Sequence, residues 1–250
     1  MADLVTPDGI RLVYDVRGDG PLVLLLHGFA SEARINWERP GVVQALVDAG
    51  HTVVTYDARG HGRSDKPHDP TAYAGDVMVH DARALLDELG AETVDVVGYS
   101  MGAQVTAALV PTEPRVRRAV LGGIGSRLLA RRPDEAAYPA GEIAEALEAE
   151  DPAQVASATG RAFRSFADAT KADRQALAAL QRARRVDGRL ALGHITVPVL
   201  VVVGDRDTLV GDAGAVADAL PDGRLETVPG DHLSAVTTPE FAAALVRFLA

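Results

Sequence analysis

The chain has 250 residues, a formal net charge of −10 at pH 7 and no cysteine. The acidic surplus disfavours nucleic acid as a partner, because phosphate binding requires a concentrated basic surface, and the missing cysteines exclude disulfides and thiolate metal sites. No stretch approaches the roughly 18 uninterrupted apolar residues of a membrane span, and the first residues lack a secretory signal, so we expect no membrane association and a cytoplasmic location.

Short segments with the composition of β-strands recur along the chain. Residues 10–16 alternate between polar and apolar side chains, which predicts an early antiparallel strand. Continuous apolar runs predict strands buried on both faces at 21–26, 52–56, 94–97, 118–121 and 199–203, followed by a shorter strand at 224–228. Helical patterns separate most of them, at 41–49, 73–89 and 101–110. This alternation predicts an α/β fold with a mostly parallel central sheet flanked by helices.

Between residues 126 and 189 the chain carries only helical signals. Asp151-Pro152 predicts a helix start, and Thr170-x-x-Asp173 resembles a capping box ahead of a helix at 175–184. The segment lies between two predicted core strands. We therefore expect one core with residues 126–189 inserted as a small helical cap over the carboxyl edge of the sheet, the core being formed by residues 1–125 and 190–250.

The junction Gly98-Tyr99-Ser100-Met101-Gly102 follows a predicted strand and precedes a predicted helix. Because glycine has no Cβ, strand and helix can approach closely at Gly98 and Gly102 while the Ser100 hydroxyl projects from a sharp turn. This arrangement is typical of a nucleophile. The alternative, a serine in an ordinary glycine-containing turn, is disfavoured by the flanking strand and helix.

A serine hydroxyl needs an imidazole as general base and a carboxylate that orients the imidazole. His232 lies in the loop after the last predicted strand, and Asp205 and Asp207 follow the strand before it. The order serine, aspartate, histidine is the one expected for a nucleophile on a strand-to-helix turn. Asp207 can curve toward the histidine loop, whereas Asp231 is disfavoured because adjacent side chains usually diverge.

Four motifs, in this order along the chain, resemble those of α/β-hydrolases of the esterase and lactonase type. They are the oxyanion loop His27-Gly28-Phe29, the loop at 56–64, the acid turn Gly204-x-x-Asp207 and the histidine loop Gly230-Asp231-His232. The resemblance implies an α/β-hydrolase fold with the catalytic residues Ser100, Asp207 and His232. It also implies an oxyanion hole made of the backbone N–H groups of Phe29 and Met101, with no cofactor or metal.

We therefore expect a serine hydrolase that cleaves a small to medium carboxylic ester or lactone through an acyl-enzyme. Ser100 argues against haloalkane dehalogenase and epoxide hydrolase chemistry, which in similar proteins needs a carboxylate nucleophile. A carbon–carbon hydrolase, a thioesterase, a cofactor-free perhydrolase and a slow-turnover ligand receptor on the same scaffold remain alternatives. The sequence predicts no acyl-chain length and no oligomeric state.

Several residues near these motifs have a structural interpretation beside the functional one. Hydrogen bonding within the loops is favoured over proton transfer for His27, Asp57 and His61. Trp37 can line the pocket or anchor the following helix. Two further aromatic residues, three apart, share one face of a predicted cap helix, where packing of cap onto core is favoured over contact with substrate; they are Phe163 and Phe166.

Overall fold

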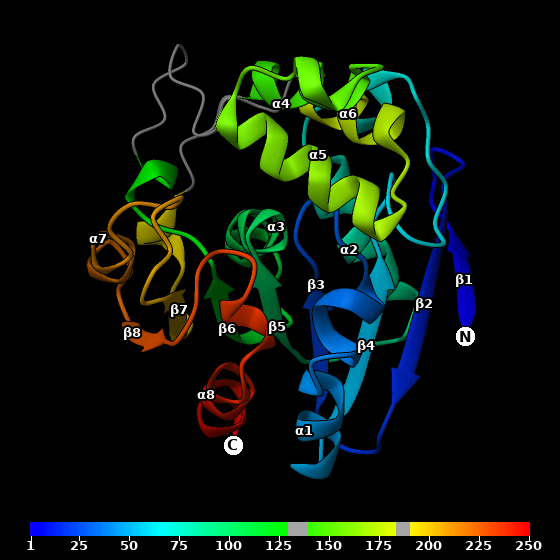
Figure 1. Cartoon of the computed structure of the whole chain (residues 1–250). Coiled ribbons are helices and arrows are strands. Elements are labelled where there is room, and N and C mark those ends of the chain that lie inside the picture. The colour runs from blue at the N-terminus through cyan, green and yellow to red at the C-terminus, as the bar shows by residue number, and fades with distance from the viewer. Residues whose placement is uncertain (130–139, 184–190) are drawn as a thin grey trace.

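The computed structural model describes residues 1–129, 140–183 and 191–250. Its strands are β1 (Ala2–Val5), β2 (Arg11–Arg17), β3 (Leu22–Leu26), β4 (Thr52–Asp57), β5 (Val94–Tyr99), β6 (Val116–Gly122), β7 (Val199–Gly204) and β8 (Gly223–Val228). They form an eight-stranded sheet in the order β1-β2-β4-β3-β5-β6-β7-β8 (Figure 1). β2 pairs antiparallel with β1 and β4, and every other neighbouring pair is parallel. The predicted fold class is confirmed.

Two layers of helices cover the faces of this sheet. Consecutive strand residues point to opposite faces, so Leu24 belongs to one buried cluster and Leu25 to the other. The first face is covered by α2 (Val77–Glu88), α3 (Met101–Leu109) and α7 (Gly214–Asp218), and the second by α1 (Val42–Asp48) and α8 (Pro239–Leu249). Burial on both faces explains why the parallel strands have continuous apolar sequences.

Three helices form a roof at one edge of the sheet: α4 (Ala140–Glu148), α5 (Ala158–Thr170) and α6 (Arg174–Arg182). They pack on one another beyond the end of β5 (Figure 1). Their small apolar cluster, which includes Ile143, Leu147 and Leu177, also contains Ala30 from the turn after β3. The division into a core and an inserted cap at 126–189 remains a proposal, and residues 130–139 and 184–190 of that cap lie outside the described residues.

Two predicted helix starts lie elsewhere in the structure. The helix predicted from residue 73 begins at Val77, because Pro70–Tyr73 forms a separate 3₁₀ turn. Asp151 caps only a short 3₁₀ turn, and α5 starts later, at Ala158. The sequence pattern also misses β1, since this strand is four residues long and mostly exposed.

The capping box predicted at Thr170-x-x-Asp173 is wrong. The Asp173 carboxylate caps α6 by accepting hydrogen bonds from the N–H groups of Gln175 and Ala176. Thr170 belongs to the end of α5, where its hydroxyl donates to the carbonyl oxygen of Phe166 at 2.9 Å. A hydroxyl that is used within its own helix does not cap the next one.

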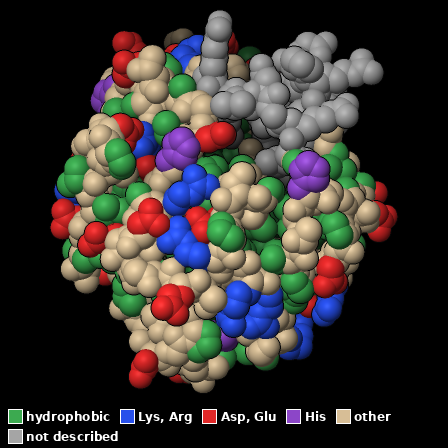
Figure 2. All heavy atoms as spheres, turned by 180° about the vertical axis from the view of Figure 1, so that it is seen from behind, with side chains coloured by type: hydrophobic (Ala, Val, Ile, Leu, Met, Phe, Trp, Pro, Cys, Tyr) green, Lys and Arg blue, Asp and Glu red, His purple; other side chains and the backbone are tan. Residues whose placement is uncertain are grey.

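The surface is mixed in charge. On the face turned away from the viewer in Figure 1, basic and acidic side chains are interspersed (Figure 2). Within the described ranges, no helix has both the length and the apolar character needed to cross a membrane.

Candidate active site

Ser100 occupies a strained turn between β5 and α3. Its φ of 51° and ψ of −108° lie in a region that few residues other than glycine adopt. The two glycines of the motif allow the turn to approach its neighbours. A Cβ on Gly98 would lie 2.3 Å from the carbonyl oxygen of Gly102, and a Cβ on Gly102 would lie 2.1 Å from that of Leu26 in β3. The sharp strand-to-helix turn expected from the sequence is therefore present.

Gly102→Ala is expected to destabilise the protein by about 3 kcal/mol, because the added Cβ would push the turn away from β3. The matched control is Gly141→Ala in α4, since a Cβ at Gly141 would meet no atom within 4 Å. Alanine favours a helix over glycine by up to about 1 kcal/mol, so the control should be neutral or stabilised. Urea denaturation measures both. Identical unfolding midpoints for Gly102→Ala and the unchanged protein would contradict this account of the turn.

The structure brings the three predicted catalytic side chains into one chain of contacts. Ser100 Oγ lies 2.9 Å from His232 Nε2, and His232 Nδ1 lies 2.8 Å from Asp207 Oδ2. The other carboxylate oxygen of Asp207 accepts the backbone N–H of Leu209 at 3.0 Å. A carboxylate at Nδ1 favours the tautomer with its proton there, which leaves the Nε2 lone pair facing the serine hydroxyl.

The two competing aspartates have other partners. Asp205 accepts the N–H of Gly230 at 2.8 Å, while Asp231 accepts hydrogen bonds from the backbone and hydroxyl groups of Ser234. Those bonds, the one from the Ser234 hydroxyl first, hold the pKa of Asp231 below its ordinary value. Of the three carboxylates considered in the sequence, only that of Asp207 contacts His232.

Of the two residues proposed for the oxyanion hole, Met101 follows Ser100 directly and Phe29 lines the same cavity as Ser100. Met101 is the first residue of α3, where backbone N–H groups have no partner inside the helix. Phe29 lies in the turn after β3. The preceding residue, Gly28, packs beside the strand-to-helix turn at Ser100, hereafter the elbow, since a Cβ placed on Gly28 would lie 3.6 Å from the Cβ of Ser100. The N–H of Gly28 donates to Asn36 Oδ1 at 3.0 Å, which ties this loop in place.

Two buried histidines connect the oxyanion loop to the loop after β4. Each Nε2 accepts a backbone N–H, and each Nδ1 faces a backbone carbonyl to which it can donate. The distances are 3.0 Å from Ala58 and 2.8 Å to Gly28 for His27, and 3.2 Å from Ala30 and 3.0 Å to Arg59 for His61. Burial lowers the pKa of both rings, that of His61 to about 3. With both nitrogens engaged, neither ring is placed to act as a base, in agreement with the structural interpretation.

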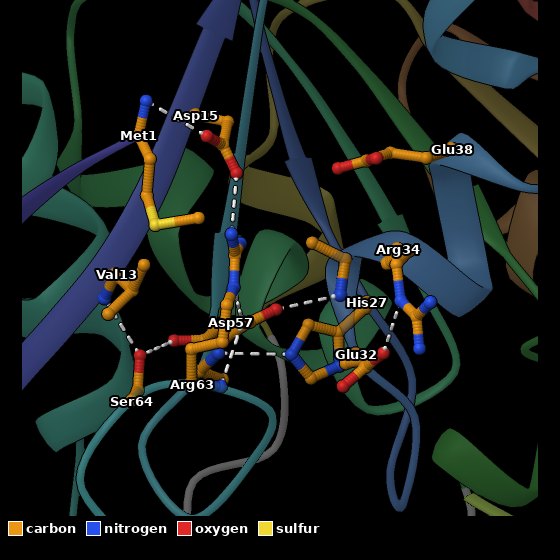
Figure 3. A network of polar contacts seen from close by, with 12 residues as sticks. Met1, Val13, Asp15, His27, Glu32, Arg34, Glu38, Asp57, Arg63 and Ser64 are labelled. Atoms are coloured by element: carbon orange, nitrogen blue, oxygen red, sulfur yellow. Dashed lines mark hydrogen bonds and ion pairs between the residues drawn. The ribbon is translucent and has the colours of Figure 1, made fainter.

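Asp57 holds the loop after β4 together (Figure 3). Its carboxylate accepts the N–H of Ala33 at 2.9 Å and the Nε of Arg63 at 2.8 Å, and Arg63 also contacts Asp15 at 2.9 Å. Burial alone would raise the pKa of Asp57, but the neighbouring His27 and the hydrogen bonds from Arg63 outweigh it, so the pKa lies below its ordinary value. These contacts join the loop after β4 to β2 and to the segment after β3, which supports a structural role.

Asp57→Asn is expected to lower the free energy of unfolding at pH 7 by about 2 kcal/mol, because Arg63 loses a charged hydrogen-bond partner. The lowered pKa means that this carboxylate stabilises the fold above the unfolded-state pKa of about 3.9. That stabilisation is lost as the pH falls through the lower folded-state value. Urea unfolding of both proteins at pH 7 and pH 3 should show a smaller difference at pH 3. A difference that does not change with pH would contradict the assignment.

Two cavities meet at the catalytic histidine candidate. The inner chamber, of about 120 Å³, is lined by Ser100 together with Phe29, Ser31 and Asn36. The outer chamber, of about 340 Å³, is lined by Asp207 and neighbouring residues of its turn. Both chambers share four lining residues, namely Phe163, Phe166, His232 and Leu233.

The structure places the aromatic residues whose roles the sequence left open. Phe163 and Phe166 line both chambers, and Phe163 also packs edge-on against Phe29 with ring centroids 5.6 Å apart. The expectation that they serve mainly to pack the cap is therefore incomplete. Trp37 is fully buried against Phe241 and belongs to the cluster beneath α1 and α8, so it anchors the core and lines neither chamber.

Reasoning from the sequence missed the roles of two residues near the site, Asn36 and Tyr99. Asn36 lies in a stretch without a motif, and its Oδ1 accepts the N–H of Gly28. The hydroxyl of Tyr99 donates to the carbonyl oxygen of His232 at 2.8 Å. Tyr99 stands inside the elbow motif, yet its partner is distant in sequence. No group of three or more metal-ligating side chains occurs among the residues that the structure describes.

Comparison with known proteins gives consistent matches. A family model described as alpha/beta hydrolase fold matches residues 21–238. "Putative carbamate hydrolase RutD" of Variovorax paradoxus (strain S110) is 32% identical over 268 residues, and the match covers 96% of either chain. Epoxide hydrolase B of Mycobacterium tuberculosis (strain ATCC 25618 / H37Rv) is 40% identical over 128 residues, which are 46% of this chain and only 35% of that protein.

A solved structure superposes on nearly the whole chain. A thermophilic esterase from Thermogutta terrifontis, studied with malate bound, superposes with a TM-score of 0.76 at 25% identity. The superposition covers 99% of this chain and 97% of the esterase.

Proposed function

The chain belongs to the α/β-hydrolase fold family, and on that premise we propose that it is a serine hydrolase of small to medium carboxylic esters or lactones. One observation carries the proposal: Ser100, His232 and Asp207 lie in hydrogen-bond contact, at 2.9 and 2.8 Å, beside a cavity. The likeness to an esterase of known structure supports it. Serine at the elbow argues against the carboxylate-nucleophile chemistry of epoxide hydrolases.

The proposed reaction has two balanced halves. Ser100 Oγ attacks the ester carbonyl carbon while its proton passes to His232 Nε2, and the backbone N–H groups of Phe29 and Met101 bind the oxyanion. The carbon–oxygen bond to the alcohol then breaks, and His232 returns the proton to the leaving oxygen. Water attacks the acyl-enzyme in the second half with His232 again as base, releasing the carboxylic acid and restoring Ser100. Asp207 orients the imidazole throughout.

A carbamate is the second candidate substrate. Its carbonyl is open to the same serine attack, and the relative RutD, 32% identical over nearly the full length, is named as a carbamate hydrolase. The inner chamber, at about 120 Å³, has room for a carbamoyl group. Parallel assays of a carbamate, an ester and a thioester of the same alcohol or thiol would rank these classes.

Labelling with a fluorophosphonate, followed by turnover of p-nitrophenyl acetate, tests the proposal. We expect a covalent adduct located on Ser100 by mass spectrometry, together with many turnovers per active site. An adduct without sustained turnover would instead support a slow ligand receptor on this scaffold. An adduct on another residue, or none, would overturn the assignment of the nucleophile.

A further inference from the structure

One contact outside the candidate triad ties His232 to the strand that leads into the nucleophile. Two consecutive residues where β5 ends reach His232 from different sides. Ser100 Oγ lies 2.9 Å from its Nε2, and the hydroxyl of the preceding residue, Tyr99, donates to its backbone carbonyl oxygen at 2.8 Å. His232 is thus held against the nucleophile through its main chain as well as through its ring.

The ring of Tyr99 is fixed in a slot behind the elbow. It is only 4% exposed, belongs to the cluster beneath α1 and α8, and packs edge-on against Phe241 with ring centroids 5.7 Å apart. Two glycines where β6 ends make room for it. A Cβ on Gly122 would lie 2.7 Å from Tyr99 Cδ2, and a Cβ on Gly123 would lie 2.9 Å from its Cζ. Because close packing leaves the ring little freedom, its hydroxyl is directed at the histidine loop.

The histidine loop is anchored on both sides of His232. The N–H of Gly230 donates to the carboxylate of Asp205 at 2.8 Å, and the N–H of Ala235 donates to the carbonyl oxygen of Asp231 at 2.9 Å. The tyrosine hydroxyl supplies a contact at His232 itself. Because a single methylene joins the imidazole to the main chain, a shift of the backbone at this residue moves Nε2 away from the serine hydroxyl.

A hydroxyl is not needed to fill the slot, since phenylalanine has the same ring, and a buried hydroxyl requires a hydrogen-bond partner. Here it donates to the main chain of the proposed general base. We propose that Tyr99 is a positioning residue whose hydroxyl keeps His232 Nε2 aligned with Ser100 Oγ. This inference rests on the proposed serine hydrolysis, because the alignment sets the rate only where Nε2 takes and returns the serine proton.

Tyr99→Phe removes the hydroxyl and keeps the ring. We expect kcat for p-nitrophenyl acetate to fall about tenfold, because a small misplacement of reacting groups lowers the rate strongly. Tyr99 also lines the inner chamber, so KM is measured as well, and it should change by less than about twofold if substrate binding is intact. The loss of one neutral hydrogen bond should lower Tm by about 3 °C.

Tyr73→Phe is the matched control. Tyr73 is also buried, at 2% exposed, and its hydroxyl likewise donates to a backbone carbonyl oxygen, that of Pro67, at 2.7 Å. It lines neither chamber. Its loss of a hydroxyl should lower Tm by a similar amount, about 3 °C, while kcat and KM stay those of the unchanged protein.

A second pair of variants shows whether the Tyr99 hydroxyl acts through the imidazole. In His232→Ala the backbone carbonyl remains but no ring is left to align, and a residual acceleration of about 10³ to 10⁴ over water leaves a measurable rate. Adding Tyr99→Phe to His232→Ala should therefore cause no further loss of kcat. A general distortion of the elbow or the oxyanion loop would instead lower the residual rate by the factor seen in Tyr99→Phe alone.

A folded Tyr99→Phe variant with the kcat of the unchanged protein would overturn this inference and leave the serine hydrolase intact. So would an equal loss of kcat in Tyr73→Phe, or a loss that persists in the His232→Ala background. Absence of hydrolysis by the unchanged protein would overturn the proposed function itself, and this inference with it.

Discussion

Ser100→Ala is expected to abolish acyl-enzyme formation and to lower kcat for p-nitrophenyl acetate by about 10⁶, the loss seen when a protease of this chemistry loses its nucleophile. The reason is that no other hydroxyl is placed 2.9 Å from His232 Nε2 among the described residues. A residual acceleration of about 10³ to 10⁴ over water should remain through binding and the oxyanion hole. Stopped-flow release of p-nitrophenol measures both the burst and the steady rate.

Ser165→Ala is the matched control for this loss. Ser165 also lies on a helix, α5, but its side chain is exposed and contacts neither chamber. Its turnover should equal that of the unchanged protein, and circular dichroism should show that both variants are folded. A folded Ser100→Ala variant that retains the burst would contradict the role of Ser100.

Asp207→Asn is expected to lower kcat by about 10⁴ with little change in the fold. An amide cannot hold the proton of His232 at Nδ1 as the carboxylate does, so the imidazole presents the wrong tautomer to Ser100. The contact of 2.8 Å between His232 Nδ1 and Asp207 Oδ2 is the basis of this expectation. Steady-state kinetics with a neutral ester, checked by thermal denaturation, measures it.

The neighbouring carboxylates supply the comparison. Asp205→Asn and Asp231→Asn keep acceptor oxygens for Gly230 and Ser234, and both residues lie away from His232 Nδ1. We expect each to keep kcat within about tenfold of the unchanged protein, as befits positions outside a triad. If Asp205→Asn loses kcat and Asp207→Asn keeps the kcat of the unchanged protein, with both variants folded, the orienting acid must be reassigned.

Local sequence patterns were informative where structure depends on near neighbours. The apolar runs of the buried strands predict the parallel sheet, because a strand covered on both faces has no polar side. The glycines around Ser100 predict the sharp turn, because only a residue without a Cβ tolerates a backbone oxygen 2.1 to 2.3 Å from that position. The capping box predicted at Thr170 was wrong. The hydroxyl of Thr170 bonds within its own helix, α5, and therefore does not cap the helix that follows.

Contacts between distant segments depend on the folded arrangement. Among three aspartates near the sheet edge the sequence favoured Asp207, and the contact itself depends on the path of two loops, which brings Asp207 to His232 while Asp205 and Asp231 bond to backbone groups. The same holds for Asn36, which has no motif and acquires its place from the π turn Arg34–Glu38 and from Gly28.

The sequence by itself determined the fold class, the strand-to-helix turn at Ser100 and the order of the candidate triad, because these follow from side-chain periodicity, from glycine sterics and from residues at the ends of neighbouring parallel strands. The tertiary structure placed Asp207, the acid already preferred in the sequence, against His232, and it alone decided that Trp37 lies in the core and that Phe163 and Phe166 line two chambers. Those outcomes depend on how α5 and the loops at the sheet edge pack together. Side chains far apart in sequence become neighbours only when apolar surfaces are buried against each other, and no local pattern records that packing.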